Sequence, residues 1–159
     1  MDQDAAVLVR ALETCGTAFE DHLHCHGTAV SLQGQGVLLL GPSGSGKSAL
    51  ALMLMAHGAD LIADDGVWVS VRDGTLMLSA PPEAPAMIEA RHVGLLSAGL
   101  ARAPVPLRLA VDLGRDDNRR LPPRRKVAWA GASAELIHGA GQPTLWAVLI
   151  QYLRGGRVA

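Results

Sequence analysis

The sequence is poor in several features that would define a class of function. It holds only two cysteines, Cys15 and Cys25, which cannot build a disulfide framework and do not form a CxxC pair suited to zinc or redox chemistry. Charged residues make up 18% of the chain and the net charge is −1, so there is no overall electrostatic reason to expect nucleic acid or an anionic membrane as partner. These absences exclude a disulfide scaffold and a broadly basic binding protein.

Long apolar runs are also missing. The longest, residues 49–56, is too short to span a bilayer, and the N-terminus MDQDAAVLVR has two acids where a signal peptide carries a basic region. We therefore expect a soluble, cytoplasmic protein. Because 49% of the 159 residues are hydrophobic, the chain can form one compact core. We predict a short extension over 1–25 and one domain over 26–159.

The pattern after residue 26 predicts an α/β fold, or a related α+β fold, with a mixed sheet. Strand-like and helical segments are separated by glycine and proline signals. The expected elements are a hairpin that ends in the strand VLLL at 37–40, a helix over 48–57 stopped by Gly58, a strand over 59–63, a hairpin around Asp73-Gly74, a strand over 106–113 and a closing helix over 144–156. Residues 87–96 are expected to be short and irregular. Residues 114–126, with six of the fourteen basic side chains, are expected to form a flexible loop.

The strongest motif is GPSGSGKS at 41–48, which fits GxxxxGKS and lies between an expected strand and an expected helix. Its glycines allow backbone N–H groups to surround phosphates, and the helix N-terminus adds partial positive charge. Lys47 is expected to reach the terminal phosphates, and the hydroxyl of Ser48 is expected to ligate Mg²⁺. The alternative is a glycine-rich turn that only caps a helix. The predicted nucleotide-binding residues are Gly41, Pro42, Ser43, Gly44, Ser45, Gly46, Lys47 and Ser48.

Two adjacent acids, Asp64 and Asp65, follow the strand after that helix. On an extended segment their side chains would point to opposite faces. One could then face the metal while the other accepts a proton from the substrate hydroxyl. The alternative is an Asp-Asp-Gly turn that closes the strand.

Three histidines and the basic loop are weaker candidates. His22, His24 and His26 alternate and could share one strand face, as metal ligands do, but nothing else nearby supplies ligands. His26 alone could equally be a surface or packed residue. Arg120 could neutralise phosphoryl charge, although most charge-rich loops are solvated surfaces.

Taken together, HGTAV at 26–30, GPSGSGKS at 41–48, LIADD at 61–65 and IEARHVGLL at 88–96 resemble the catalytic domain of bacterial HPr kinase/phosphorylase. The resemblance covers about residues 26–154 and implies a P-loop kinase fold of the HPr kinase / PEP carboxykinase-like type. It implies an enzyme that uses ATP and Mg²⁺ to phosphorylate a serine of HPr, a phosphocarrier of the sugar phosphotransferase system. In that family the same site can remove the phosphate by attack of inorganic phosphate.

The resemblance also implies roles for single residues. Asp65 matches the family's proton acceptor, Lys47 its active-site lysine and His26 an active-site histidine that handles phosphate. Arg120, in RRLPP, matches the catalytic arginine. Ser48 and Glu89 match the Mg²⁺ ligands, and Asp64 is expected near the metal. A hexamer is implied as well.

The sequence departs from the family in four places. We expect residues 1–25 to form a short extension at the place of the family's separate N-terminal domain. Ala49 follows the phosphate-loop serine where the family usually has an acid, and His92 replaces a glycine in the segment written EIRGLG. The stretch ELIHGAGQPT does not preserve the family's loop for dephosphorylation, which puts phosphorylase activity in doubt.

We therefore carry three hypotheses from the sequence. The first is a serine kinase of HPr or an HPr-like paralogue. The second is a small-molecule kinase on the same phosphate loop, although few lid elements are apparent. The third is a regulatory module that binds ATP without turnover. The altered C-terminal loop and Ala49 favour it mildly, and the retained Lys47, Ser48, Asp65 and Glu89 oppose it.

Overall fold

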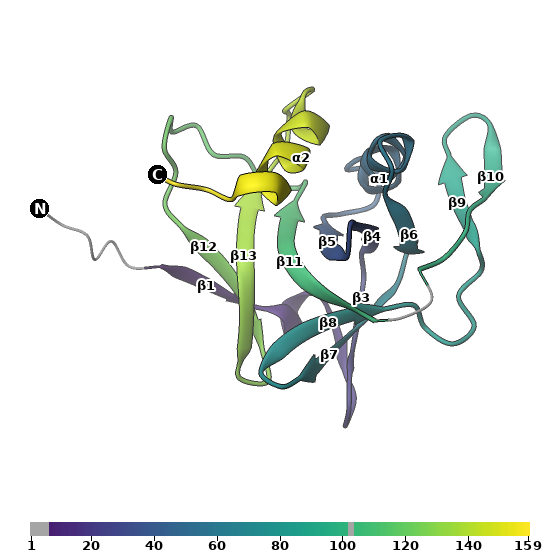
Figure 1. The fold of residues 1–159 in the computed structure, drawn as a ribbon, viewed down its shortest axis with the longest axis horizontal. Helices are drawn as coiled ribbons and strands as arrows, with labels where there is room; N and C mark the ends of the chain where they lie inside the picture. The colour runs from purple at the N-terminus through teal and green to yellow at the C-terminus, as the bar shows by residue number, and fades with distance from the viewer. Residues whose placement is uncertain (1–6, 102–103) are drawn as a thin grey trace, which may run out of the picture.

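A computed structural model describes residues 7–101 and 104–159. Its frame is a large curved sheet, with the two longest helices side by side on one face (Figure 1). The predicted α/β fold with a mixed sheet is confirmed. In the described part of the chain, neither helix has the length and apolar character needed to cross a membrane.

The elements follow one another along the chain with short connections. They are β1 (Leu8–Ala11), the 3-10 helix η1 (Leu12–Cys15), β2 (Gly16–Ala18), β3 (Leu23–Cys25), β4 (Thr28–Leu32), β5 (Gln35–Leu40), α1 (Lys47–Ala56), β6 (Asp60–Ala63), β7 (Val67–Arg72), β8 (Thr75–Ser79), β9 (Met87–Ala90), β10 (Gly94–Ser97), β11 (Val105–Asp112), β12 (Arg125–Trp129), β13 (Ala132–His138) and α2 (Leu145–Gly155).

The centre of the sheet is a set of parallel strands. β11 runs parallel to both β5 and β13, while β4 pairs antiparallel with β5 and with β6. In register, Asp112 lies beside Leu40 of β5 on one side and beside His138 of β13 on the other. The carboxyl ends of β5, β11 and β13 therefore meet at one edge of the sheet, which is where open α/β sheets place their ligands.

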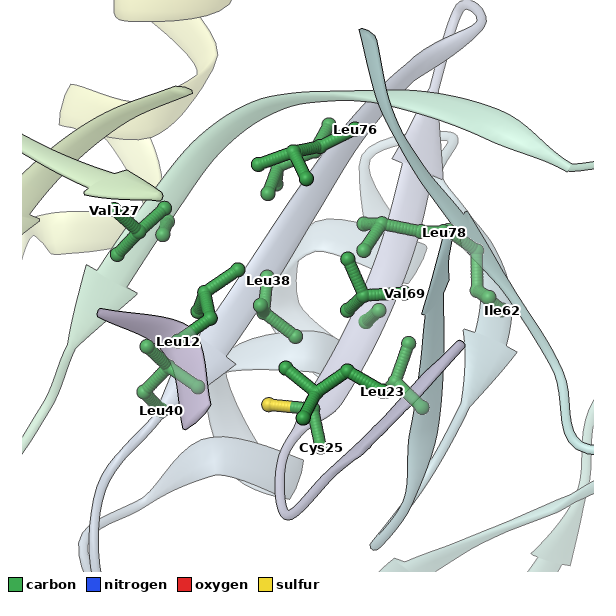
Figure 2. Packing of buried hydrophobic residues seen from close by; sticks show 14 of the residues in the cluster. Leu12, Leu23, Cys25, Leu38, Leu40, Ile62, Val69, Leu76, Leu78 and Val127 are labelled. Carbon is green, nitrogen blue, oxygen red and sulfur yellow. The ribbon is translucent and has the colours of Figure 1, made fainter. Parts of the chain in front are cut away.

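Two apolar clusters lie on the two faces of the sheet. One packs inside the curve of the strands and includes Leu12, Leu38, Val69 and Leu78 (Figure 2). The other lies under the helices, where α2 contributes Leu145, Leu149 and Leu153 at intervals of one helical turn. Because VLLL of β5 has residues in both clusters, this strand is buried on both faces, as its continuous apolar sequence predicts.

Three tight turns fix hairpin registers. The turns Gln33-Gly34, Asp73-Gly74 and Ala130-Gly131 each have positive φ at both residues, which matches the twist of the strands they join. They connect β4 to β5, β7 to β8 and β12 to β13. The first two hairpins were predicted, and α1 and α2 coincide closely with the helices expected over 48–57 and 144–156.

The structure differs from expectation in three segments. Residues 87–96, expected to be irregular, mostly belong to the antiparallel strands β9 and β10, which form a separate two-stranded sheet. Residues 125–138 form β12 and β13, which were not predicted. The segment 8–25, expected as an extension, contributes β1, η1, β2 and β3, and its strands pair with β12 and β7.

Candidate functional site

The phosphate loop runs from the end of β5 to the first turn of α1. Gly41, Gly44 and Gly46 all have positive φ, with Gly46 capping the helix. A Cβ on Gly41 would lie 2.7 Å from Ser45 Oγ and 3.1 Å from the backbone nitrogen of Gly114. The loop therefore closes so tightly that a side chain would not fit at its first position, as expected of a cradle of backbone N–H groups. The hydroxyl of Ser45 is buried there without a partner among the described residues.

Lys47 folds back over this loop. Its Nζ donates hydrogen bonds to the carbonyl oxygens of Gly41, at 2.7 Å, and Pro42, at 3.2 Å. The ammonium group therefore lies over the beginning of the loop, in reach of the place where terminal phosphates bind in loops of this sequence.

Ser48 connects the loop to the acid pair. Its Oγ donates a hydrogen bond of 2.9 Å to Asp64 Oδ1. The same oxygen accepts a 2.8 Å bond from Thr28 Oγ1, and the backbone nitrogen of Glu89 donates to Asp64 Oδ2 at 3.1 Å. Three segments thus converge on the carboxylate of Asp64, which holds it in a single orientation.

These groups fit a magnesium site. Mg²⁺ prefers oxygen ligands and usually takes one or two carboxylates from the protein, with phosphate and water completing its shell. Asp64 and Ser48 offer such oxygens, and Glu89 is exposed beside them. No cluster of three or more His, Cys, Asp or Glu side chains that could hold a metal ion occurs in the residues described.

Asp65 does not continue the strand. Its φ of 59° places it in the left-handed region, and the nitrogen of the following Gly66 donates to the carbonyl of Gly27 at 2.8 Å. The expectation that Asp64 and Asp65 alternate on an extended segment is therefore wrong, because a turn begins at Asp65. The alternative prediction, a turn that closes the strand, is therefore correct for the backbone. The turn leaves the side chain of Asp65 exposed, directly after the buried residues of β6.

The hairpin of β9 and β10 adds a basic group. Arg91 follows β9 directly, and its Nη2 lies 3.8 Å from the position of a Cβ on Gly44. Its guanidinium therefore lies near the middle of the phosphate loop. His92 has a φ of 68° in the tight turn, which accounts structurally for the glycine found at this place in the family segment.

The histidines do not form a metal cluster. His22 stacks between Phe19 and Trp68, with ring centroids 4.9 and 3.8 Å away. The rings of His24 and His26 meet edge to face at 5.8 Å. His22 is thus a packing residue, whereas His26 is exposed and lines a cavity with Gly41 and Pro42, which leaves it within the site.

Arg120 lies in the loop between β11 and β12 and is exposed. Within the described parts of the chain, no hydrogen bond or ion pair connects it to Lys47, Ser48 or the acid pair. The structure therefore brings the loop, Asp64 and Glu89 together but does not join Arg120 to them.

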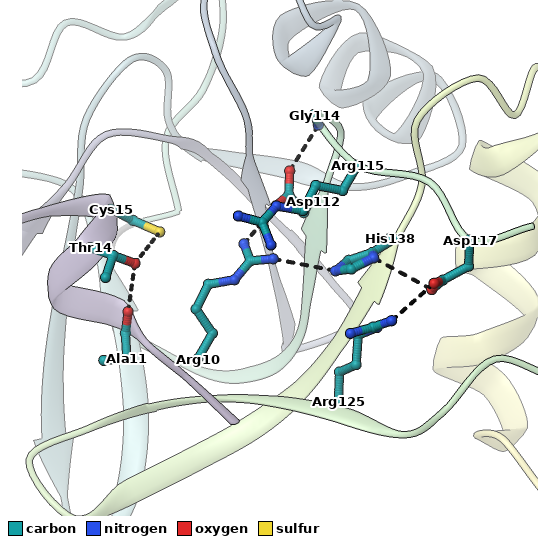
Figure 3. Close-up of polar contacts among 10 residues, drawn as sticks. All are labelled: Arg10, Ala11, Thr14, Cys15, Asp112, Gly114, Arg115, Asp117, Arg125 and His138. Atoms are coloured by element: carbon teal, nitrogen blue, oxygen red, sulfur yellow. Dashed lines mark hydrogen bonds and ion pairs between the residues drawn. The ribbon is translucent and has the colours of Figure 1, made fainter. Parts of the chain in front are cut away.

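A charged network that was not predicted lies at the ends of β11 and β13 (Figure 3). Arg10 donates to Asp112 Oδ2 at 2.6 Å and lies 3.3 Å from His138 Nε2. His138 Nδ1 is 3.5 Å from Asp117, which accepts a 2.9 Å bond from Arg125. The sequence hints at this network only through an ionisable residue at the end of each of the two strands, Asp112 in β11 and His138 in β13. Arg10, which contacts both, is more than 100 residues away in the sequence.

This network sets the charge states of two buried groups. Burial opposes ionisation of Asp112, but hydrogen bonds from Arg10 and from the nitrogen of Gly114 outweigh it and lower the pKa of the carboxyl group. Burial lowers the pKa of His138, and the positive charge of Arg125 lowers it further, while Asp117 opposes this shift. Asp112 is therefore an anion and His138 a neutral imidazole near neutral pH.

Asp112 also connects the network to the phosphate loop. Its Oδ1 accepts a 2.8 Å hydrogen bond from the nitrogen of Gly114. A Cβ on Gly114 would lie 2.8 Å from Cδ of Pro42. The turn held by Asp112 thus packs directly against the beginning of the loop.

Comparison with known sequences identifies relatives. A sequence model of the HPr serine kinase C-terminal domain matches residues 17–100, more than half of the chain. The HPr kinase/phosphorylase of Clostridium botulinum (strain Eklund 17B) is 38% identical over 101 residues, covering 58% of this chain and 33% of that protein. HPr kinase/phosphorylase 1 of Oceanobacillus iheyensis is 32% identical over 121 residues, covering 72% of this chain and 39% of that protein. The chain thus spans less than half the length of these relatives.

A solved structure is similar in fold. The Hpr(Ser) kinase/phosphatase from Coxiella burnetii superposes with a TM-score of 0.70, over 82% of this chain and 95% of that chain. The sequences are 21% identical, so this likeness shows the fold and not the activity.

Proposed function

Because the chain belongs to the HPr serine kinase C-terminal domain family, we propose that it transfers the γ-phosphoryl group of ATP to a serine of HPr or of an HPr-like phosphocarrier. The observation that carries this proposal is the 2.9 Å hydrogen bond from Ser48 to Asp64. This bond joins the helix that begins at the phosphate loop to Asp64, the neighbour of Asp65 in the sequence, and so supports a site in which the two acids act together beside the loop.

The loop and Lys47 are proposed to hold the nucleotide. Backbone N–H groups between Gly41 and Ser48 and the N-terminus of α1 favour bound phosphates. Lys47 would exchange the carbonyl oxygens of Gly41 and Pro42 for phosphate oxygens. Transfer of a phosphoryl group depends mainly on such positioning and on neutralising charge.

Ser48 and Asp64, with Glu89 beside them, are the residues that would hold Mg²⁺. When bound, the ion neutralises charge that develops on the transferred group. Thr28 and the nitrogen of Glu89 donate hydrogen bonds to the carboxylate of Asp64, and contacts of this kind orient a ligand before a metal binds.

Asp65 is proposed as the general base. The serine oxygen forms a bond to the γ-phosphorus as the bond to the bridging oxygen of ADP breaks, and the hydroxyl proton passes to the carboxylate of Asp65. Its exposed position suits a substrate that is itself a protein. We also propose that His26, which lines a cavity beside Gly41 and Pro42, and Arg120 handle phosphoryl charge, as the resemblance implies. The resemblance further implies a hexamer, and we propose a cytoplasmic location.

The deciding experiment is to incubate the purified protein with MgATP and either HPr or a paralogous carrier, and then to map phosphoserine by mass spectrometry. We expect one phosphoserine that depends on both ATP and Mg²⁺. Nucleotide binding without phosphoserine on any carrier would favour the regulatory module that binds ATP without turnover. ATP consumption with a metabolite alone would favour the small-molecule kinase. Adding inorganic phosphate to the phosphorylated carrier tests the reverse reaction.

A further inference from the structure

A cavity of about 540 Å³ opens beside the phosphate loop, between η1, the end of β5 and the turn after β11. Arg10, His26, Gly41, Pro42, Asp112 and Arg115 are among the residues that line it. Pockets of 300 to 1,000 Å³ typically hold an organic ligand or a group of side chains, so this one is larger than a single phosphate ion requires. A smaller hollow of about 320 Å³ shares Arg10 and Arg115 with it.

The cavity adjoins the part of the loop nearest to the transferred group. Nζ of Lys47 rests on the carbonyl oxygens of Gly41 and Pro42, and both of these residues line the cavity. Since this lysine reaches the terminal phosphates of a nucleotide, the γ-phosphate would end near the cavity wall. The acceptor must approach from beyond that phosphate, in line with the bond that breaks.

The cavity carries surplus positive charge. Its lining includes two arginines and one carboxylate. Arg10, 19% exposed, is committed to Asp112 through a contact of 2.6 Å. Arg115 is 65% exposed, and its Nε lies 3.6 Å from the same carboxylate. The guanidinium of Arg115 therefore lies beside Asp112 (Figure 3), and most of its side chain is open to solvent.

We propose that this cavity binds an acidic side chain of the phosphoryl acceptor, close to the target serine, and that Arg115 is the residue that pairs with it. Arginine pairs with a carboxylate through two parallel hydrogen bonds, which adds orientation as well as affinity. The inference rests on the proposed kinase function and adds to it the chemistry by which the acceptor is recognised.

The test compares Arg115→Ala with the control Arg119→Ala, which removes the same charge from an exposed position in the same loop. Loss of a hydrogen-bonded charge pair should raise KM for the carrier about tenfold. The kcat and the KM for ATP should stay within about twofold of the wild type, since Arg115 lies outside the phosphate loop. Arg119→Ala should change none of the three.

A charge exchange makes the test specific. Arg115→Glu should bind the carrier still more weakly, and one Asp→Lys or Glu→Lys variant of the carrier should restore its KM. A second readout needs no turnover: because Cys15 lines the cavity, the carrier with MgADP should slow alkylation of Cys15 in the wild type and not in Arg115→Glu. Cys25 is a silent control, since its thiol is buried and burial raises its pKa to about 12.

The results separate the two proposals. If the wild type forms phosphoserine but both alanine variants have the same KM for the carrier, the acceptor pocket is wrong and the kinase function stands. If Arg115→Ala weakens only inhibition by inorganic phosphate, the cavity holds free phosphate and not a side chain of the acceptor. If the wild type phosphorylates no carrier, both proposals fall.

Discussion

Ser48, in the first turn of α1, donates a 2.9 Å hydrogen bond to Asp64, which directly follows β6. The two residues lie 16 positions apart, and the helix between them packs on the sheet through Leu50 and Leu54. The geometry of these two proposed metal ligands is therefore set by the packing of a whole helix and not by one loop.

Replacing Ser48 with Ala should remove most of the magnesium dependence of nucleotide binding. Isothermal titration with ADP should show an affinity in Mg²⁺ at least about tenfold below that of the wild type, near the value measured with EDTA. Thr28→Val is the matched control, because it removes the other hydroxyl bond to Asp64 Oδ1 without removing a metal ligand. An equal loss in both variants would mean that Ser48 only orients Asp64.

Asp65→Asn should abolish transfer and spare binding. Loss of a general base usually lowers kcat by about 10²- to 10⁴-fold, while ADP affinity should be unchanged because, among the described residues, no hydrogen bond or ion pair joins Asp65 to the phosphate loop. The substitution keeps the shape of the side chain, and Asn tolerates the left-handed backbone found here. A phosphorylation rate equal to the wild type would remove Asp65 from the proposed mechanism.

Gly41→Ala should damage the phosphate loop selectively. A methyl group there meets Ser45 and Gly114, and the backbone has a φ of 139°. ADP affinity should fall by more than about tenfold, since strain of about 1–3 kcal/mol adds to the clash. Gly58→Ala introduces similar strain, with a φ of 102° and no atom within 4 Å, but lies at the far end of α1. It should lower stability against urea and leave ADP affinity intact.

Stability should fall as the pH is lowered below neutrality. Burial and Arg125 hold the pKa of His138 below its ordinary value of 6.5 in the folded state, so unfolding takes up a proton. The contribution of neutral His138 to the free energy of unfolding is therefore complete above the pKa that this histidine has in the unfolded chain. It is lost as the pH falls from that value toward the lower pKa of the folded state. Asp112, whose folded pKa is also lowered, adds a second decline below about pH 4.

Urea titrations over a series of pH values measure both declines. His138→Gln should flatten the first one, between about pH 7 and pH 5, because Gln does not titrate, while the decline below about pH 4 should remain. A slope in the first range that is the same in the variant and the wild type would show that His138 is not its source.

The parts of the fold predicted best from the sequence are those whose signals are local. VLLL of β5, the loop that follows it and the apolar run of α1 are contiguous, so strand, loop and helix could be placed together. Asp73-Gly74 marks its hairpin by itself, since both residues have positive φ. The sequence also predicted that Ser48 and one of the two acids lie near the same metal ion, because the acids follow the strand that comes after the helix.

Other elements depend on partners that are distant in the chain. β12 begins inside the run of arginines and prolines that resembles a loop, and becomes a strand by pairing with β1 and β13. Arg10 and Asp112 are 102 residues apart, so no spacing in the sequence could connect them. The direction predicted for the side chain of Asp65 was wrong because the strand was assumed to continue through this residue, whereas its backbone is left-handed.

The ammonium group of Lys47 has a consequence for selectivity. Its Nζ already donates hydrogen bonds to the carbonyl oxygens of Gly41 and Pro42. A ligand that binds Lys47 must therefore compete with these two carbonyl groups for the N–H groups of the ammonium. A phosphate chain, with full negative charge, can win this exchange, whereas a neutral ligand gains nothing by it. We therefore expect the loop to select ligands by their charge, with an affinity that reflects the difference between the bonds formed to phosphate and the bonds given up by Lys47.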